Sequence, residues 1–194
     1  MYEAMRPDPK ASACTDRLWD GVSGLSLATA GDIDRQAVTD ERQLVAYDEA
    51  ISTLASLGAT LKPFELALST LASSNGLICF AEGYHHHRTL VDDPSAVLDE
   101  TIRSRLIEAG NMPAHQYIDA LAGREPAARA FLSALGERAA LLVPTTPILP
   151  PPLDEVDPST ACSILTRAVN YLGLCAISIP TGLTSPTAKD PAKD

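Results

Sequence analysis

The sequence has few aromatic residues, few lysines and no long apolar run. Phe, Trp and Tyr make up 5% of the 194 residues, whereas hydrophobic residues make up 45% and charged residues 21%. This is the composition of a globular chain with an aliphatic core. No apolar run approaches the roughly 20 residues that a membrane-spanning helix needs. The formal net charge is -10 and no Lys/Arg cluster interrupts it, which disfavours nucleic acids and anionic membranes as partners.

Signals for metals, disulfides and secretion are also missing. Four cysteines occur, none at C-x-x-C spacing and none with a histidine at metal-ligand spacing: Cys14, Cys79, Cys162 and Cys175. We therefore expect free thiols and a cytoplasmic protein. Residues 85–87 are three consecutive histidines, but adjacent side chains of a helix point in different directions, so we predict no metal site. The first ten residues have no apolar stretch of the kind found in signal peptides. No cofactor is predicted.

Composition divides the chain into a central domain and two polar tails. Residues 1–16 and 184–194 are predicted to be flexible tails, and residues 17–183 form the domain. In its first part we predict a strand within residues 24–29, a turn at Gly31 and Asp32, a helix over 38–57 and a short strand over 59–66. Pro63 places the second strand at a sheet edge or ends it early.

The middle of the domain is predicted to be helical. A long apolar segment over residues 65–90 indicates a buried helix, which Asn75-Gly76 could break. Apolar residues at helical spacing predict further helices over 97–109 and 113–138. Pro126 lies inside the last of these and should kink or split it.

Two short apolar runs near the C-terminus predict buried strands. Residues 139–144 are apolar on both faces, which is typical of a fully buried strand. Six prolines between 144 and 158 predict a loop, and Ser159 or Thr160 could cap a helix over 159–172. Residues 175–180 are predicted to be the second buried strand.

Four features in this order resemble the amidase signature family, which includes bacterial amidases and the A subunit of the glutamyl-tRNA amidotransferase. They span about residues 22–183. They are a helix ending in Leu57-Gly-Ala-Thr60 before a strand; Ala81-Glu82 followed by His87-Arg88; Tyr117-x-x-Ala120-x-x-x-Arg124 leading into Leu141-Leu-Val-Pro-Thr-Thr-Pro147; and Asn170-x-x-Gly173-Leu-Cys-Ala-Ile-Ser-Ile-Pro-Thr-Gly182.

The resemblance implies an α/β fold, an α/β/α sandwich around a mixed sheet, and hydrolysis of a carboxamide C–N bond. It also implies a triad of a nucleophilic Ser, a second Ser preceded by a cis peptide bond, and a Lys. In that triad the Lys acts as a base through the second Ser, and backbone N–H groups form the oxyanion hole. A small amide is the substrate that this chemistry implies for the full-length parent.

The sequence departs from the family where the catalytic residues belong. The nucleophile is expected in a Gly-Gly-Ser-Ser-Gly-Gly-type loop, whose glycines let backbone amides approach an oxyanion, and no such loop occurs. Ser73-Ser74 is the nearest serine pair, but its context is apolar and helical. Of the four lysines, Lys62 alone lies outside the predicted tails, at a position without a catalytic role in the family. We therefore expect a C-terminal part of the fold that lacks its N-terminal portion, with no catalytic residue of its own.

Four residues are candidates for the wall of a substrate pocket. Arg124 falls where some family members contact a substrate carboxylate, although an exposed helical arginine is the alternative. Thr145 and Thr146 follow a predicted strand at the end where α/β folds bind ligands, or they serve only the turn between prolines. Asn170 could support the site or simply pack.

Three functional hypotheses remain open at this level. The first is an inactive amidase-type unit. The second is a non-catalytic partner that complements a separate N-terminal half or forms a homo-oligomer, because a sheet cut in two exposes an edge. The third is a self-contained binding domain unrelated to amide chemistry.

Overall fold

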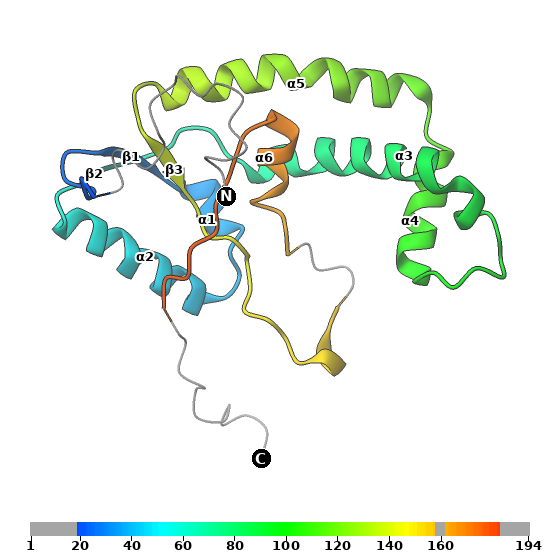
Figure 1. The fold of residues 1–194 in the computed structure, drawn as a ribbon, viewed down its shortest axis with the longest axis horizontal. Helices are drawn as coiled ribbons and strands as arrows, with labels where there is room; N and C mark the ends of the chain where they lie inside the picture. The colour runs from blue at the N-terminus through cyan, green and yellow to red at the C-terminus, as the bar shows by residue number, and fades with distance from the viewer. Residues whose placement is uncertain (1–18, 158–161, 183–194) are drawn as a thin grey trace.

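A computed structural model describes residues 19–157 and 162–182 (Figure 1). The predicted tails 1–16 and 184–194 therefore lie outside the described residues, as do the predicted cap residues Ser159 and Thr160. A small sheet lies at one end of an elongated molecule, and long helices extend from it to the other end. None of the described helices is long and apolar enough to span a membrane.

The sheet has three parallel strands in the order β2-β1-β3. The strands are β1 (Ser26–Thr29), β2 (Thr60–Pro63) and β3 (Ala140–Leu142). Leu27 of β1 is opposite Leu61 of β2 and Ala140 of β3. The three strands lie where the sequence predicts strands, but the expectation of a mixed sheet is wrong for the described chain, because helices carry the chain back between strands and every pair is parallel.

The strand β1 leads through two helices to β2. The first, α1 (Asp32–Gln36), lies where the sequence predicted only a turn. Gly31 precedes this helix, and Asp34 within it is buried. The second, α2 (Glu41–Ser56), begins at Asp40, whose carboxylate accepts the Arg42 N–H at 3.0 Å. Asp40 is thus the N-cap of this helix.

Between β2 and β3 the chain forms three helices, α3 (Ala72–Val91), α4 (Glu100–Gly110) and α5 (Ala114–Leu135). A 3₁₀ turn, Ser69–Leu71, precedes α3. The Asn75-Gly76 pair does not break α3, and the helix is only partly buried, since most of its length meets solvent. Pro126 does not split α5, because the described helix continues through it. Val97, which was expected on the apolar face of α4, precedes that helix and is fully exposed.

The C-terminal part contradicts two expectations. The predicted helix over 159–172 is only α6 (Arg167–Leu172) in the described residues, and it ends at Gly173 with a φ of 68°, a conformation that suits glycine. Residues 175–180 form no strand and are exposed rather than buried. The strand β3 is half-buried rather than fully buried, because it forms one edge of the described sheet.

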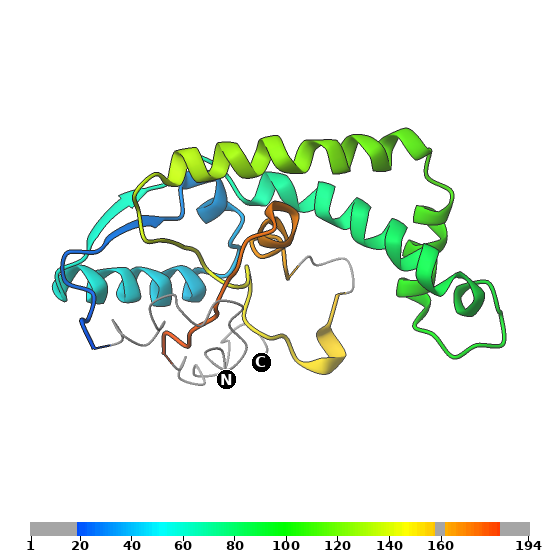
Figure 2. The same cartoon turned by 45° about the horizontal axis from the view of Figure 1, so that its top comes forward.

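The main core lies on one face of the sheet. Buried residues from β1, the β2–α3 segment, α3, α5 and α6 meet there: Ala28, Phe64, Leu68, Ile78, Phe131, Ala168, Tyr171 and Leu172. Phe64 and Phe131 pack edge to face, with ring centroids 5.1 Å apart. Figures 1 and 2 show α5 and α3 running side by side on this face, with α2 on the opposite face of the sheet. The described chain is therefore layered helix, sheet, helix, with the third layer formed by α2.

Candidate functional site

The strand order creates a switch point at the carboxyl ends of β1 and β3. The chain leaves β1 through α1 and α2 to pair β2 on one side, whereas β3 pairs on the other side of β1. Adjacent parallel strands whose connections leave in opposite directions open a crevice at their carboxyl ends, where open α/β sheets bind ligands. The predicted pocket residues Thr145 and Thr146 follow β3 at this edge.

The loop after β3 is fixed to α2 by several hydrogen bonds. The backbone N–H groups of Thr39 and Asp40 both donate to the Pro147 carbonyl, at 3.0 and 3.1 Å. The Gln43 amide donates to Thr146 Oγ1 at 3.2 Å and to the Ile148 carbonyl at 3.1 Å. A helix face thus holds the loop by backbone and side-chain groups together, which gives the threonines a defined position.

A buried tyrosine hydroxyl joins the two strands at the crevice. Tyr47 Oη accepts the Ala30 N–H at 2.7 Å and donates to the Leu142 carbonyl at 2.8 Å. It thereby bridges the ends of β1 and β3 where their direct pairing stops. Burial raises the pKa of Tyr47 above its usual value, so the phenol stays protonated and acts as a fixed donor and acceptor.

The first threonine of the pair contacts a distant part of the chain. Thr145 Oγ1 and Ser178 Oγ lie 3.0 Å apart, and both side chains are exposed. The contact brings residues 175–180 beside the loop after β3, where Figure 1 shows the red C-terminal stretch crossing near the yellow one. The switch point therefore carries hydroxyls from two segments far apart in sequence.

Arg124 and Asn170 come together away from Thr145 and Thr146. The Arg124 guanidinium on α5 donates from Nε to the Tyr171 carbonyl at 2.8 Å and from Nη2 to the Asn170 carbonyl at 3.2 Å. These carbonyls belong to the last turn of α6, where the Asn170 carbonyl also accepts the Gly173 N–H at 3.1 Å. Tyr171 Oη returns a hydrogen bond to the Ala120 carbonyl of α5 at 3.0 Å. In this structure Arg124 therefore clasps α5 to α6 through backbone atoms.

A buried carboxylate fixes the start of α3. Asp34 is 1% exposed, and its two oxygens accept the N–H groups of Leu68 and Ser69 at 2.8 and 2.9 Å and the Ser69 hydroxyl at 2.7 Å. Next to it, a Cβ on Gly31 would lie 2.5 Å from the Phe64 carbonyl oxygen, so the two segments approach through the absence of a side chain. These contacts set the path of the chain on both sides of β1.

The other polar residues that the sequence singled out are not combined into a catalytic arrangement. Ser73 and Ser74 lie in the first turn of α3, which is regular helix and not a glycine loop. Lys62 is exposed on the edge strand β2. Residues 85–87 are exposed on α3, and no group of three or more potential metal ligands lies together among residues 19–157 and 162–182.

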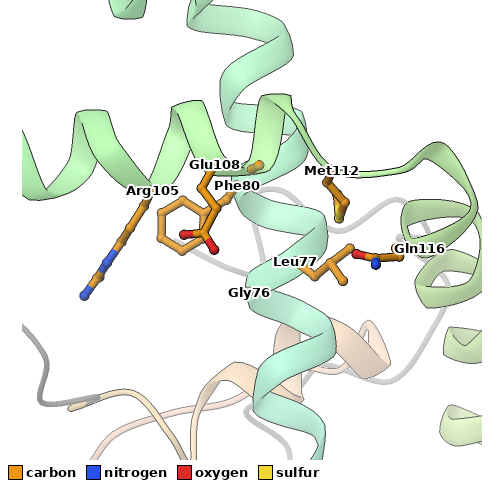
Figure 3. A pocket seen from close by; sticks show the side chains of 8 residues that line it. Gly76, Leu77, Phe80, Arg105, Glu108, Met112 and Gln116 are labelled. Carbon is orange, nitrogen blue, oxygen red and sulfur yellow. The ribbon is translucent and has the colours of Figure 1, made fainter.

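One surface hollow among the described residues lies away from the switch point. It has a volume of about 400 Å³ and lies between α3, α4 and the start of α5 (Figure 3). The Arg105 guanidinium lies 6.0 Å from the centre of the Phe80 ring. None of the four predicted pocket residues lines it; its walls are Gly76, Leu77, Phe80, Arg105, Glu108, Ala109, Met112 and Gln116.

Comparison with solved structures explains this architecture. A structure described as an unexpected vestigial protein complex that reveals the evolutionary origins of an s-triazine catabolic enzyme superposes with a TM-score of 0.72 and 20% identity. The match covers 89% of this chain and 41% of the other. A bacterial aryl acylamidase of the amidase signature family matches with a TM-score of 0.66, 14% identity, and 88% and 39% coverage of the two chains. The described chain has part of the amidase fold.

A third match extends the same result. The glutamyl-tRNA(Gln) amidotransferase A chain from Thermotoga maritima superposes with a TM-score of 0.58 and 21% identity, over 81% of this chain and 35% of its own. The present chain therefore spans about two-fifths of the length of the first amidase-fold proteins that it matches. No family model and no curated protein matches the sequence. Identities at this level establish the fold and leave activity to be argued from residues.

The sequence missed the residues that organise the switch point. Gln43 and Tyr47 lie four residues apart and so share one face of α2, one turn beyond Asp40. The signal that could have identified them is a pair of polar residues four positions apart on a helix that also covers the sheet. The partner of Thr145, Ser178, carried no signal because residues 175–180 were expected to be a buried strand.

Proposed function

We propose that this chain is an amidase-type unit that provides scaffold and pocket wall for hydrolysis of a carboxamide C–N bond. The Ser, Ser and Lys groups of that reaction would come from outside the 194 residues. The observation that carries this proposal is the match to amidase folds over 89% of the chain, combined with a sequence that has no Gly-Gly-Ser-Ser-Gly-Gly-type loop. The chain alone is then inactive, and a small amide is the substrate of the complete assembly.

The geometry of the switch point supports the role of a pocket wall. Thr145 and Thr146 present hydroxyl groups at the carboxyl ends of parallel strands, where a substrate amide would find hydrogen-bonding partners. Tyr47 and Gln43 hold this edge rigid, as a preorganised site requires. Arg124 is a separate candidate from these threonines: two of its guanidinium nitrogens bond the end of α6, as the Thr146 hydroxyl bonds Gln43 and Ile148. Asn170 is placed with Arg124.

Amide hydrolysis by the isolated chain tests the proposal. Purified protein is incubated with benzamide, and release of ammonia is followed beside the double variant Ser73→Ala, Ser74→Ala. We expect both proteins to match buffer, because those serines lie on a regular helix and not in a glycine loop that could activate a nucleophile. Hydrolysis by the unchanged chain that disappears in the double variant would show that it carries its own nucleophile.

A second function, as a non-catalytic partner of another polypeptide, is favoured by one observation. Residues 175–180 are apolar in sequence yet exposed, with Ile177 at 84% and Ile179 at 67% exposure. Exposed apolar segments of this kind mark interaction sites.

We also propose that the protein is cytoplasmic. The described cysteines Cys79, Cys162 and Cys175 are exposed and free, which supports this proposal.

A further inference from the structure

The two edges of the described sheet differ in how they are protected. On β2, Lys62 and Pro63 are both exposed. A lysine and a proline, which has no N–H to donate, are devices by which natural edge strands avoid pairing with another chain. The β2 edge is therefore closed to strand addition.

The β3 edge has neither device. Ala139 donates its backbone N–H to the Ser26 carbonyl of β1 at 2.8 Å. Because alternate residues of a strand direct their backbone groups to opposite edges, Ala140 directs its N–H and C=O away from β1. The strand Ala140–Leu142 is entirely apolar, and no strand pairs with this edge among the residues that the structure describes. An apolar edge without lysine or proline is open to an added strand.

The exposed segment 175–180 lies beside the loop that follows this edge strand. Gly173 ends α6 in a left-handed conformation, and the Leu174 N–H returns to the Val169 carbonyl at 3.0 Å, which directs the following residues away from the helix. The contact between Ser178 and Thr145 then holds the segment beside the loop after β3. Two apolar stretches that the sequence marks as buried strands thus lie near each other: β3, which is half-buried, and 175–180, which is exposed.

We propose that the β3 edge and residues 175–180 form one docking surface that takes an amidase-type polypeptide segment as additional parallel strand. This rests on the proposed function. The occupant is argued from the superpositions: the matched amidase-fold chains are covered only to 41% and 39%, so most of each of those polypeptides lies outside the matched part. The docked segment is the one that carries the Gly/Ser loop absent from this sequence.

Parallel addition has a consequence for the site. Parallel strands end at the same edge of a sheet, so a strand added beside β3 would place its carboxyl end next to Thr145 and Thr146. A glycine-serine loop that follows such a strand would then face these hydroxyls across the switch point. A second copy of this chain would supply no such loop, and it is an outcome that the test distinguishes.

Four single variants separate this surface from general effects on folding. Ala140→Pro removes the N–H that faces away from β1, and Ile177→Lys places a charge on a side chain that is 84% exposed. Leu61→Pro is the control for the first, because Thr60 and Phe64 donate to β1 and Leu61 faces the outer edge of β2. Val97→Lys is the control for the second, at a fully exposed position on a distant loop.

The experiment expresses the tagged protein in its native cells and identifies stoichiometric partners by mass spectrometry. We expect a protein whose sequence holds a Gly-Gly-Ser-Ser-Gly-Gly-type loop, and recovery about tenfold lower for Ile177→Lys and Ala140→Pro, since a buried unpaired charge or a lost strand bond weakens association. Both controls should recover it fully. Hydrogen exchange at the Ala140 amide should slow in the complex. The same slowing is expected if the loop-bearing segment and this chain belong to one longer polypeptide.

Three results would overturn the docking surface: equal recovery by all four variants, self-association as the only complex, or a monomer in which the Ala140 amide is already protected. Capture of a protein without the glycine-serine loop counts against it as well. If the isolated chain still fails to hydrolyse amides, any of these outcomes rejects the docking surface and leaves the proposed function intact. Failure of the docking surface is therefore distinguishable from failure of the proposed function.

Discussion

The hydroxyl of Tyr47 is the sharpest test of how the switch point is held together. Tyr47→Phe keeps the ring, which is 7% exposed, and removes the oxygen that bonds both Ala30 and Leu142. The Ala30 N–H would then be buried without a partner, and the Leu142 carbonyl partly so. A buried unsatisfied group costs about 1–3 kcal/mol, so we expect a loss of about 2–3 kcal/mol from the free energy of unfolding.

Urea unfolding followed by circular dichroism measures this loss. With a slope of about 2 kcal/mol per molar urea, the midpoint should fall by about 1 M at unchanged slope. Tyr84→Phe is the matched control, because the Tyr84 hydroxyl bonds Asp92 at the surface at 3.2 Å, and we expect less than about 0.5 kcal/mol there. Equal midpoints for the two variants would refute the bridging role of Tyr47.

The same tyrosine predicts a pH dependence. Burial raises the pKa of Tyr47 above the ordinary value of 10.0, so the folded state holds this proton more tightly than the unfolded state. Its contribution is complete below about pH 10 and is lost as the pH rises through the folded-state pKa. The stability difference between the unchanged protein and Tyr47→Phe should therefore shrink above pH 10. A constant difference would contradict the assigned burial.

Three further changes test the neighbouring contacts. Gly31→Ala places a Cβ 2.5 Å from the Phe64 carbonyl oxygen and should cost about 1–3 kcal/mol in urea unfolding, and an unchanged midpoint would contradict that close approach. Arg124→Met should speed hydrogen exchange in α6 while leaving α2 unchanged, because the guanidinium bonds to the Tyr171 and Asn170 carbonyls are lost and the Asn170 carbonyl keeps only the Gly173 N–H; equal effects on both helices would argue against the clasp. Asp40→Ala should cost about 1 kcal/mol at neutral pH. The side-chain hydrogen bond from Arg42 lowers the pKa of Asp40 to about 2, so this difference should persist above about pH 4 and disappear as the pH falls toward 2, and an unchanged difference at low pH would contradict it.

Local patterns predicted the elements of the first half well. The helix α2 and the strand β2 followed from apolar spacing and from Pro63, both of which act within a few residues. The edge position expected from Pro63 is confirmed by the strand order. The five-residue α1 was missed, because a helix so short has too few residues to show an apolar period.

Errors arose where long-range packing decides the outcome. An apolar run such as 175–180 has the residues of a buried strand, but a strand needs a neighbour, and no strand pairs with this run in the described structure. Pro126 was expected to kink or split α5; it does not split the helix, which continues to Leu135 with Phe131 buried in the core, and the kink stays a prediction. The mixed sheet was inferred from a family whose members are longer than this chain, and the three strands present here are all parallel.

The candidate site was predictable only in part. Thr145 and Thr146 were located from a strand end and its proline loop, and the structure places them at the switch point. Arg124 and Asn170 were predicted from a family motif, which gives only their positions along the chain. The motif does not show that the Arg124 guanidinium donates to two carbonyls of α6. Whether any of the four contacts a substrate stays a prediction.

The central claim is that this chain carries amidase scaffold without an activated serine. A fluorophosphonate reagent, which forms a covalent bond with activated serines whatever the natural substrate, tests it most directly when intact mass is measured before and after treatment. A bacterial amidase that holds the Gly-Gly-Ser-Ser-Gly-Gly-type loop serves as the positive control. We expect no adduct on the isolated chain, while the control is labelled. An adduct of one reagent per chain, mapped to Ser73, Ser74 or any other serine, would contradict it.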